Sequence, residues 1–146
     1  MADILNYFKV SESLATSGQP TVEQFGFIAE GSYEVVINLA MPNSDNAIPN
    51  EGEIVSSNGM SYIHIPVSWE NPQISDLILF CNIMKSIQKK KVWVHCAKNM
   101  RVSCFVYLYQ KHVLKLPDVK ARYPMDKIWS PDGVWAELIV ESENAL

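Results

Sequence analysis

The sequence predicts an α/β fold: a single domain with a mainly parallel central β-sheet and helices on both faces. Runs rich in β-branched and aromatic residues, at 33–39, 61–67 and 92–95, alternate with segments of helical spacing, and this alternation is typical of a parallel sheet covered on both sides. The run at 92–95 is apolar on both faces except at its last position, as in a central parallel strand. The chain has 146 residues, 48% of them hydrophobic, which is enough for one buried core and too few for two, so we expect one domain over residues 1–146.

The first part of the chain predicts a strand, a turn and a short helix. Residues 14–17 lead into a turn at 18–20. Thr21 and Gln24 then form the capping-box pattern of a helix start, and Gly31 is placed to end that helix.

The stretch between the next two strands, residues 41–59, is polar and contains two prolines and two glycines. Such a composition predicts a long surface excursion. Residues 51–57 have room in it for one or two helical turns.

Three further helices follow from apolar spacing. Asn71 and Pro72 offer an N-cap and an N1 proline, residues 102–113 carry one apolar stripe, and Ser130 and Pro131 begin a final helix. The residues expected to face inward are Ile74, Leu77, Ile78, Cys81 and Met84 in the first helix, Val102, Phe105, Val106, Tyr109 and Val113 in the second, and Val134 and Leu138 in the third, with Trp135 as a further candidate.

Charge and composition exclude several classes of function. The net charge is −4, the sequence pI is about 5.3, and the one cationic run is at residues 89–91, so we expect no nucleic-acid partner. Residues 1–6 lack the basic and apolar regions of a secretory signal, and no apolar run is long enough to span a membrane. We therefore expect a cytoplasmic protein with no membrane partner.

The three cysteines, Cys81, Cys96 and Cys104, fit neither a disulfide framework nor a Cys-x-x-Cys site. The three histidines do not have the spacing of metal ligands. We therefore expect no metal and no cofactor. Cys81 and Cys104 fall in helices and are expected to act as small hydrophobic residues, with a regulatory disulfide to Cys96 as the alternative.

The most informative segment is 92–103, in which a strand delivers His95 and Cys96 into a loop and Arg101 follows five positions after the cysteine. A loop between a strand and a helix turns its backbone N–H groups inward, and the helix N-terminus adds partial positive charge, so both a thiolate and an oxyanion are stabilised there. Arginine supplies a permanently charged fork for two oxygens. In parallel sheets ligands bind beyond the carboxyl ends of the strands, where this loop begins.

The segments at 14–21, 36–39, 62–67 and 95–103 together resemble the cysteine-based protein tyrosine and dual-specificity phosphatase superfamily. The resemblance is closest to small bacterial members, such as the phosphatase-like domains found with β-lactamase-hydrolase-like proteins. It implies a dual-specificity phosphatase-like fold and a phosphorylated substrate, protein or small molecule. The pattern leaves the substrate's identity and the oligomeric state open.

The resemblance also implies roles for the residues of the loop. Cys96 is the expected nucleophile, which forms a cysteinyl-phosphate that water then hydrolyses. His95 is expected to orient the loop and to favour the thiolate, and the Ser103 hydroxyl to hydrogen-bond the departing thiolate. The expected phosphate ligands are the backbone amides of Ala97, Lys98, Asn99 and Met100 and the guanidinium of Arg101.

The loop departs from the family pattern because four residues, rather than five, separate Cys96 from Arg101. Counted without a gap, Val102 falls on the arginine position, and Arg101 is rotated by roughly 100° on the helix. Alternatively one residue is deleted, Arg101 keeps its role, and Asn99 supplies the left-handed conformation that glycine usually provides. We favour the deletion, because a buried guanidinium without an anion is costly.

Two other functions remain open. Four intervening residues are also the length of the active loop in rhodanese-like sulfurtransferases, in which Cys96 would carry a persulfide. The altered spacing and the missing acid aspartate also fit a catalytically silent module that binds phosphate or a partner.

The general acid is expected at Glu70, the one carboxylate in the segment that matches the family's acid loop. Asp76 is more simply a first-turn helix residue. The sequence Trp-Ser-Pro-Asp at 129–132 is similar to the family's Trp-Pro-Asp loop, but it follows the cysteine loop, so we interpret it as a helix cap.

Overall fold

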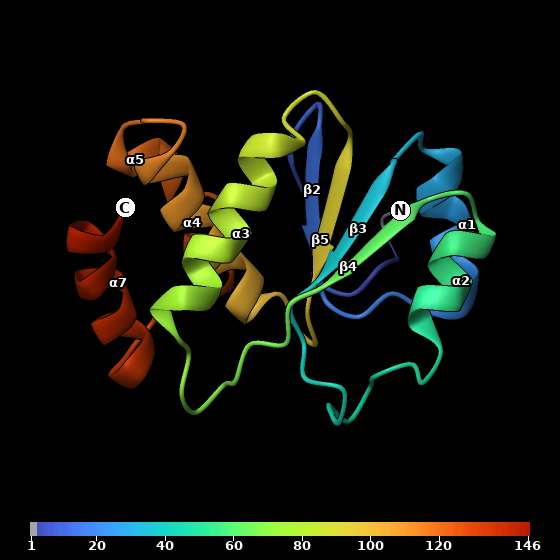
Figure 1. Ribbon diagram of the computed structural model, residues 1–146, viewed down its shortest axis with the longest axis horizontal. Coiled ribbons are helices and arrows are strands. Elements are labelled where there is room, and N and C mark those ends of the chain that lie inside the picture. The colour runs from blue at the N-terminus through green and yellow to red at the C-terminus, as the bar shows by residue number, and fades with distance from the viewer. Residues whose placement is uncertain (1–2) are drawn as a thin grey trace.

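The computed structural model describes residues 3–146 and shows a central sheet with helices on both sides (Figure 1). The order of elements along the chain is β1 Phe8–Ser11, β2 Leu14–Ser17, α1 Val22–Glu30, β3 Val35–Asn38, α2 Glu51–Ser57, β4 Ser61–His64, α3 Ile74–Ser86, β5 Val92–His95, α4 Met100–His112, α5 Asp118–Ala121, α6 Met125–Ile128 and α7 Gly133–Ala145.

The sheet has the strand order β1-β2-β5-β3-β4, in which only β1 runs antiparallel to its neighbour. All four residues of β5 are buried, which confirms its prediction as a central parallel strand. Ser17 of β2 and Asn38 of β3 pair with His95 in the sheet register. The carboxyl ends of three parallel strands therefore meet directly before Cys96.

Side-chain alternation along the strands divides the core between the two faces of the sheet. Ala15, Val36 and Trp93 pack with α1 and α2 on one face. The intervening strand residues, such as Ile37 and Val94, pack with α3, α4 and α7 on the other (Figure 1). The predicted α/β class with both faces covered is confirmed.

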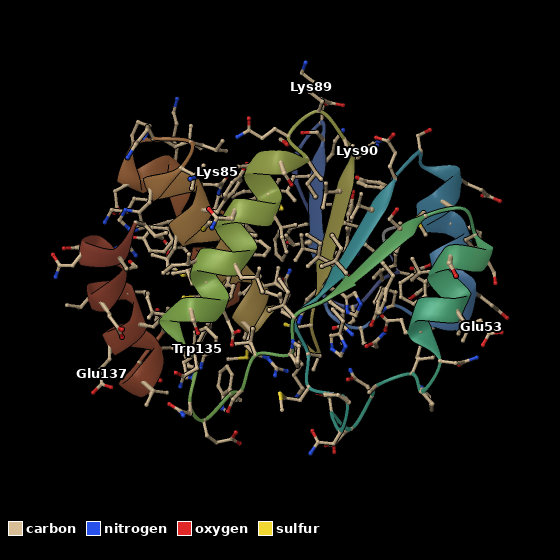
Figure 2. The ribbon with its side chains drawn as sticks, in the orientation of Figure 1. Glu53, Lys85, Lys89, Lys90, Trp135 and Glu137 are labelled. Carbon is tan, nitrogen blue, oxygen red and sulfur yellow. The ribbon has the colours of Figure 1, made fainter. Side chains whose placement is uncertain are left out.

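Several local predictions are also confirmed. The side chains of Thr21 and Gln24 form both hydrogen bonds of a capping box at the start of α1. The polar excursion carries the helix α2 over Glu51–Ser57. Lys89 and Lys90 project into solvent from the turn before β5 (Figure 2), at the opposite end of that strand from Cys96.

Two predicted helix starts are wrong. The N-cap of α3 is Gln73 rather than Asn71, because the Asn71 N–H donates to the Ser68 hydroxyl at 3.1 Å and so belongs to the preceding turn. The N-cap of α7 is Asp132, followed by Gly133 in a left-handed conformation with φ +54°.

The phase of α7 also differs from the prediction at one position. Val134 is 40% exposed, whereas Trp135 and Leu138 face the core. These two residues lie three apart and share a stripe with the buried Ser142, and Val134 falls outside that stripe. The edge strand β1 and the short helices α5 and α6 were not predicted. No helix described over residues 3–146 has the length and apolar character needed to cross a membrane.

Candidate active site

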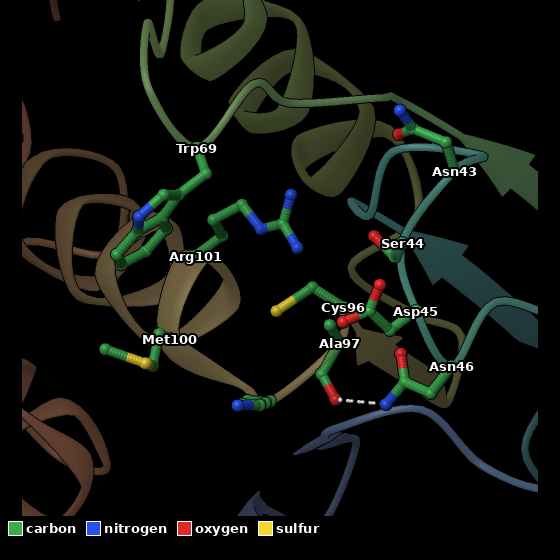
Figure 3. Close-up of a pocket in the computed structure, with 10 residues that line it drawn as sticks. Asn43, Ser44, Asp45, Asn46, Trp69, Cys96, Ala97, Met100 and Arg101 are labelled. Carbon is green, nitrogen blue, oxygen red and sulfur yellow. Dashed lines mark hydrogen bonds between the residues drawn. The ribbon is translucent and has the colours of Figure 1, made fainter.

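A pocket of about 620 Å³ opens beyond the carboxyl ends of the parallel strands (Figure 3). It brings together most of the predicted loop residues with a second segment that precedes α2. Its lining residues are Asn43, Ser44, Asp45, Asn46, Trp69, Cys96, Ala97, Lys98, Met100 and Arg101.

The loop after Cys96 is held from outside by hydrogen bonds to its carbonyl groups. The Ala97 carbonyl accepts from the backbone N–H of Gln19 and from the Asn46 side-chain amide, each at 3.1 Å. The Lys98 carbonyl accepts from the Asn6 side-chain amide at 3.0 Å. Because C=O and N–H point in opposite directions across a trans peptide, these bonds turn the following N–H groups toward the inside of the loop.

The backbone N–H groups of residues 97–102 belong to this loop and to the first residues of α4. None of them donates a hydrogen bond to any residue between 3 and 146; the first N–H of this segment with a backbone partner is that of Ser103, which donates to Asn99 at 3.0 Å. They lie at the N-terminus of α4, a helix of 13 residues, whose dipole adds partial positive charge. Free N–H groups at a helix N-terminus are a feature that favours anions.

Asn99 makes the tight turn of the loop. Its backbone is left-handed, with φ 69° and ψ 8°. Its buried side-chain amide donates to the Asn6 carbonyl at 2.9 Å and to the Thr16 hydroxyl at 3.0 Å. Asn99 thus has the conformation expected if one residue is deleted from the family loop, and its side chain fixes the loop to β2.

Arg101 lies in the first turn of α4 and lines the pocket with Cys96 (Figure 3). The side chain is only 7% exposed, and its Nη1 donates to the Val67 carbonyl at 2.9 Å. No carboxylate within residues 3–146 forms an ion pair with it. A buried charge without a counter-ion is unfavourable, so the remaining N–H donors are poised for an anion in the pocket. Arg101 thus lies in the pocket together with Cys96.

His95 lies behind the loop rather than in the pocket. Its Nε2 is 2.6 Å from Oε2 of Glu51, and both side chains are buried. The other Glu51 oxygen accepts from the Gln19 side-chain amide at 2.7 Å, and Nδ1 of His95 lies 3.3 Å from the Cys96 carbonyl. Both ring nitrogens therefore face oxygen acceptors, and these contacts fix the orientation of the ring directly behind the cysteine.

Glu51 was not identified from the sequence. A glutamate in the first turn of a helix usually reflects the helix dipole and lies in solvent. Glu51 is buried because α2 packs against the sheet, and the residues that cover it are distant in the sequence.

Gly18 approaches the cysteine loop so closely that only glycine fits. A Cβ at this position would lie 2.8 Å from the Ala97 carbonyl oxygen and 2.9 Å from Cδ2 of Leu5. The predicted turn at 18–20 therefore does more than connect β2 to α1, because it supports the loop.

The structure does not bring the Ser103 hydroxyl to Cys96. The hydroxyl donates to the Met100 carbonyl at 2.9 Å and accepts from Nε1 of Trp129 at 3.0 Å. Ser103 lies in the helix, where a serine can bond the carbonyl three residues earlier. In this geometry it fixes the first turn of α4 instead of contacting the thiol.

Glu70 is exposed and is not among the residues that line the pocket. Its neighbour Trp69 does line it, and the Trp69 carbonyl accepts from Nε1 of Trp135 at 2.9 Å. The rings of Trp69, Trp129 and Trp135 form a cluster with centroids 5.3 to 6.1 Å apart. The segment expected to carry the acid is thus held against α7.

The one carboxylate that does line the pocket, among the described residues, is Asp45. It was missed because it lies in the polar excursion. Because β3 lies beside β5 in the sheet, the excursion that follows β3 reaches the cysteine loop that follows β5. The spacing of residues in the sequence does not reveal that these two strands are neighbours.

All three cysteines are free and buried. Burial raises the pKa of both Cys81 and Cys104 to about 12. Cys96 is the cysteine that lines the pocket.

Comparison with known proteins agrees with this geometry. Residues 6–137 match a family model described as DSP-PTPase phosphatase fused to NAD+ kinase. No curated protein sequence matches the chain.

Solved structures give the same fold. A DUF442 protein from Shewanella putrefaciens CN-32, described as a candidate phosphatase, is 33% identical with a TM-score of 0.87, and the alignment covers 99% of this chain and 95% of that one. Tk-PTP in its active form is 16% identical with a TM-score of 0.81, over 97% and 98% of the two chains. PTPMT1 in complex with PI(5)P is 15% identical with a TM-score of 0.80, over 95% of each chain.

The extent of the family match and the identity to the Shewanella protein agree with the residues first noted in the sequence. The chain belongs to the dual-specificity and protein tyrosine phosphatase family.

Proposed function

We propose that this protein is a phosphoric monoester hydrolase that acts through a cysteinyl-phosphate intermediate, with a shortened Cys-x4-Arg anion loop. The observation that carries the proposal is the buried Arg101, which has no carboxylate partner within residues 3–146 and shares a pocket with Cys96. Arg101 supplies a permanent charge and Cys96 a thiol to this pocket, and the loop between them has backbone N–H groups without a hydrogen-bond partner within residues 3–146.

In the first step the Cys96 thiolate attacks phosphorus, an S–P bond forms, and the P–O bond to the leaving group breaks. A proton passes from an acid to the leaving oxygen. The N–H groups of residues 97–102 and the Arg101 guanidinium hold the three equatorial oxygens, where charge is concentrated in phosphoryl transfer. Their orientation before substrate arrives reduces the reorganisation that the transition state requires.

In the second step water attacks the phosphorus of the cysteinyl-phosphate and gives a proton to the conjugate base of the acid. The S–P bond breaks, the thiolate re-forms, and inorganic phosphate leaves. The partial positive charge at the N-terminus of α4 favours the departing thiolate, and the His95–Glu51 pair holds the loop that carries it.

The substrate is proposed as a phosphorylated protein or small molecule. The PTPMT1 structure holds a phosphoinositide, so the fold accepts a phosphomonoester on a lipid headgroup. The free cysteines fit a reducing compartment, and we propose the cytoplasm.

The decisive experiment is hydrolysis of para-nitrophenyl phosphate by the wild type and by Cys96→Ser. The expected result is turnover by the wild type, loss of turnover in the variant, and a phosphorylated Cys96 trapped by rapid acid quench and found by mass spectrometry. Sulfur transfer from thiosulfate without phosphate hydrolysis would instead establish a rhodanese-like enzyme. A rise in Tm with inorganic phosphate but no turnover of either substrate would establish a silent binding module.

A further inference from the structure

The pocket has a wall that the mechanism above leaves unused. This wall is the segment 43–46, between β3 and α2, which faces the side of Trp69 across the pocket (Figure 3). Among the residues that the structure describes as lining the pocket, Asp45 is the one carboxylate. The hydrolysis proposed above needs a carboxyl group of this kind.

The sheet brings this wall to the cysteine loop. β3 lies directly beside β5, and the Leu39 N–H donates to the His95 carbonyl at 2.9 Å. Both backbone polar groups of the next residue, Ala40, have partners. Its N–H donates to Oδ1 of Asn38 at 2.8 Å, and its carbonyl lies 2.7 Å from Nε2 of His64. The segment therefore leaves the sheet in a defined direction, toward the pocket.

A tight turn then sets the position of Asp45. The Ala47 N–H donates to the Ser44 carbonyl at 3.0 Å, so Asp45 and Asn46 are the central residues of the turn. The Asn46 amide donates to the Ala97 carbonyl at 3.1 Å. One residue of the turn thus binds the cysteine loop from outside, and the adjacent residue reaches the pocket.

The expected acid Glu70 has no comparable placement. Both Glu70 and Asp45 are exposed, but Glu70 does not line the pocket, and the Trp69 carbonyl before it accepts from Nε1 of Trp135 at 2.9 Å. The packing of the Trp69 ring against Trp129 and Trp135 restricts movement of this segment.

From this geometry we infer that Asp45 is the general acid and base of the reaction; the inference rests on the proposed function. In the first step the protonated Asp45 carboxyl gives its proton to the leaving oxygen as the P–O bond breaks. In the second step the Asp45 carboxylate takes a proton from the water that attacks the cysteinyl-phosphate, which restores the acid. The acid is then supplied by the segment between β3 and α2, and not by the segment after β4 that contains Glu70.

The test compares Asp45→Asn and Glu70→Gln with aryl phosphates of different leaving groups. Phenyl phosphate needs a proton on its leaving oxygen, whereas 2,4-dinitrophenyl phosphate does not. We expect Asp45→Asn to lower kcat/KM for phenyl phosphate by about 100-fold or more and for the dinitrophenyl ester by less than about 10-fold. Glu70→Gln should reduce the two substrates equally and slightly.

Glu53→Gln, an exposed carboxylate in α2, is the matched control and should leave both rates unchanged. Unchanged Tm values would show that each variant is folded. A leaving-group-dependent loss in Glu70→Gln, or equal losses for both esters in Asp45→Asn, would overturn the inference while Cys96→Ser still abolishes wild-type turnover. Absence of any wild-type hydrolysis would overturn both this inference and the proposed function.

Discussion

Oε2 of Glu51 lies 2.6 Å from Nε2 of His95, in a pair that solvent does not reach. The two residues are 44 positions apart, and their contact joins α2 to the end of β5 immediately before the nucleophile. Gln19 completes the network from the turn after β2. Three segments of the chain are therefore fixed to one another directly behind the cysteine loop.

Replacement of Glu51 by alanine should strongly destabilise the protein. The change removes the carboxylate that contacts both His95 and Gln19, and Gln19 keeps only its bond to the Pro20 carbonyl. Removing one partner from a buried contact of this kind costs about 3 kcal/mol. Urea unfolding measures the free-energy difference. Glu53→Ala, on the exposed side of the same helix, should change it by less than about 0.5 kcal/mol. Similar losses for the two variants would show that the buried pair contributes nothing specific.

Substitutions at Asn99 should separate the backbone conformation from the side-chain bonds. Both Asn99→Gly and Asn99→Ala lose the bonds to Asn6 and Thr16. Only alanine also has to adopt φ 69°, so it should be less stable than the glycine variant by about 1 kcal/mol. Thermal unfolding under identical conditions measures the difference. Equal stability of the two variants would contradict a strained left-handed turn at this position.

Arg101→Met should abolish the effect of phosphate on stability. In the wild type, inorganic phosphate is expected to raise Tm because it neutralises a buried guanidinium. The methionine variant keeps much of the side-chain volume and removes the charge, so its Tm should not respond to phosphate.

The conservative variant Arg101→Lys tests the geometry of the same contact. Lysine retains the charge but lacks the planar fork, and kcat/KM should fall by about 100-fold. A kcat/KM equal to that of the wild type in Arg101→Lys would contradict a bidentate contact between Arg101 and phosphate.

Iodoacetamide should modify Cys96 before the other two cysteines in the native protein. Burial raises the pKa of Cys81 and Cys104 to about 12, so neither forms the reactive thiolate near neutral pH. Peptide mass spectrometry gives the labelling rate at each site, and phosphate should slow labelling at Cys96. Labelling of Cys104 at a comparable rate without denaturant would be the contrary result.

A second ion network, remote from the pocket, predicts a dependence of stability on pH. Hydrogen bonds from Tyr107 and Arg122 lower the pKa of Asp118 to about 2 in the folded protein. An unfolded aspartate titrates near 3.9, so the stabilising contribution is fully present above about pH 4 and is lost as the pH falls through about 2.

The Asp118 carboxylate is 44% exposed, so solvent limits this contribution to about 1 kcal/mol or less. Urea unfolding of the wild type and of Asp118→Asn at pH 7 and at pH 2 isolates it. The wild type should be the more stable of the two at pH 7, and the difference should shrink at pH 2. A difference that does not change with pH would exclude the network.

The sequence allowed prediction wherever the determinants are local. Thr21 and Gln24 are three residues apart and cap α1 without help from the rest of the chain. The apolar run of β5 is also a local signal. So is the short spacing between Cys96, at the end of that strand, and Arg101, in the first turn of α4.

The residues that escaped prediction depend on tertiary neighbours. Asp45 and Glu51 look like ordinary solvated acids in a polar stretch, and only the pairing of β3 with β5 brings them to the pocket and to His95. The Ser103 hydroxyl illustrates the opposite case, since its local bond to the Met100 carbonyl competes with the role that family resemblance implied. The spacing of residues along the chain predicts neither the tertiary contacts of Asp45 and Glu51 nor the hydrogen-bond partner of Ser103.

The tryptophan cluster gives the protein an optical property. Three of its four tryptophans, Trp69, Trp129 and Trp135, have ring centroids 5.3 to 6.1 Å apart, and Trp69 also lines the pocket. The fourth, Trp93, lies on the other face of the sheet against Tyr7 and Tyr33. Trp69 is therefore placed to report occupancy of the pocket as a change in intrinsic fluorescence, without any attached dye.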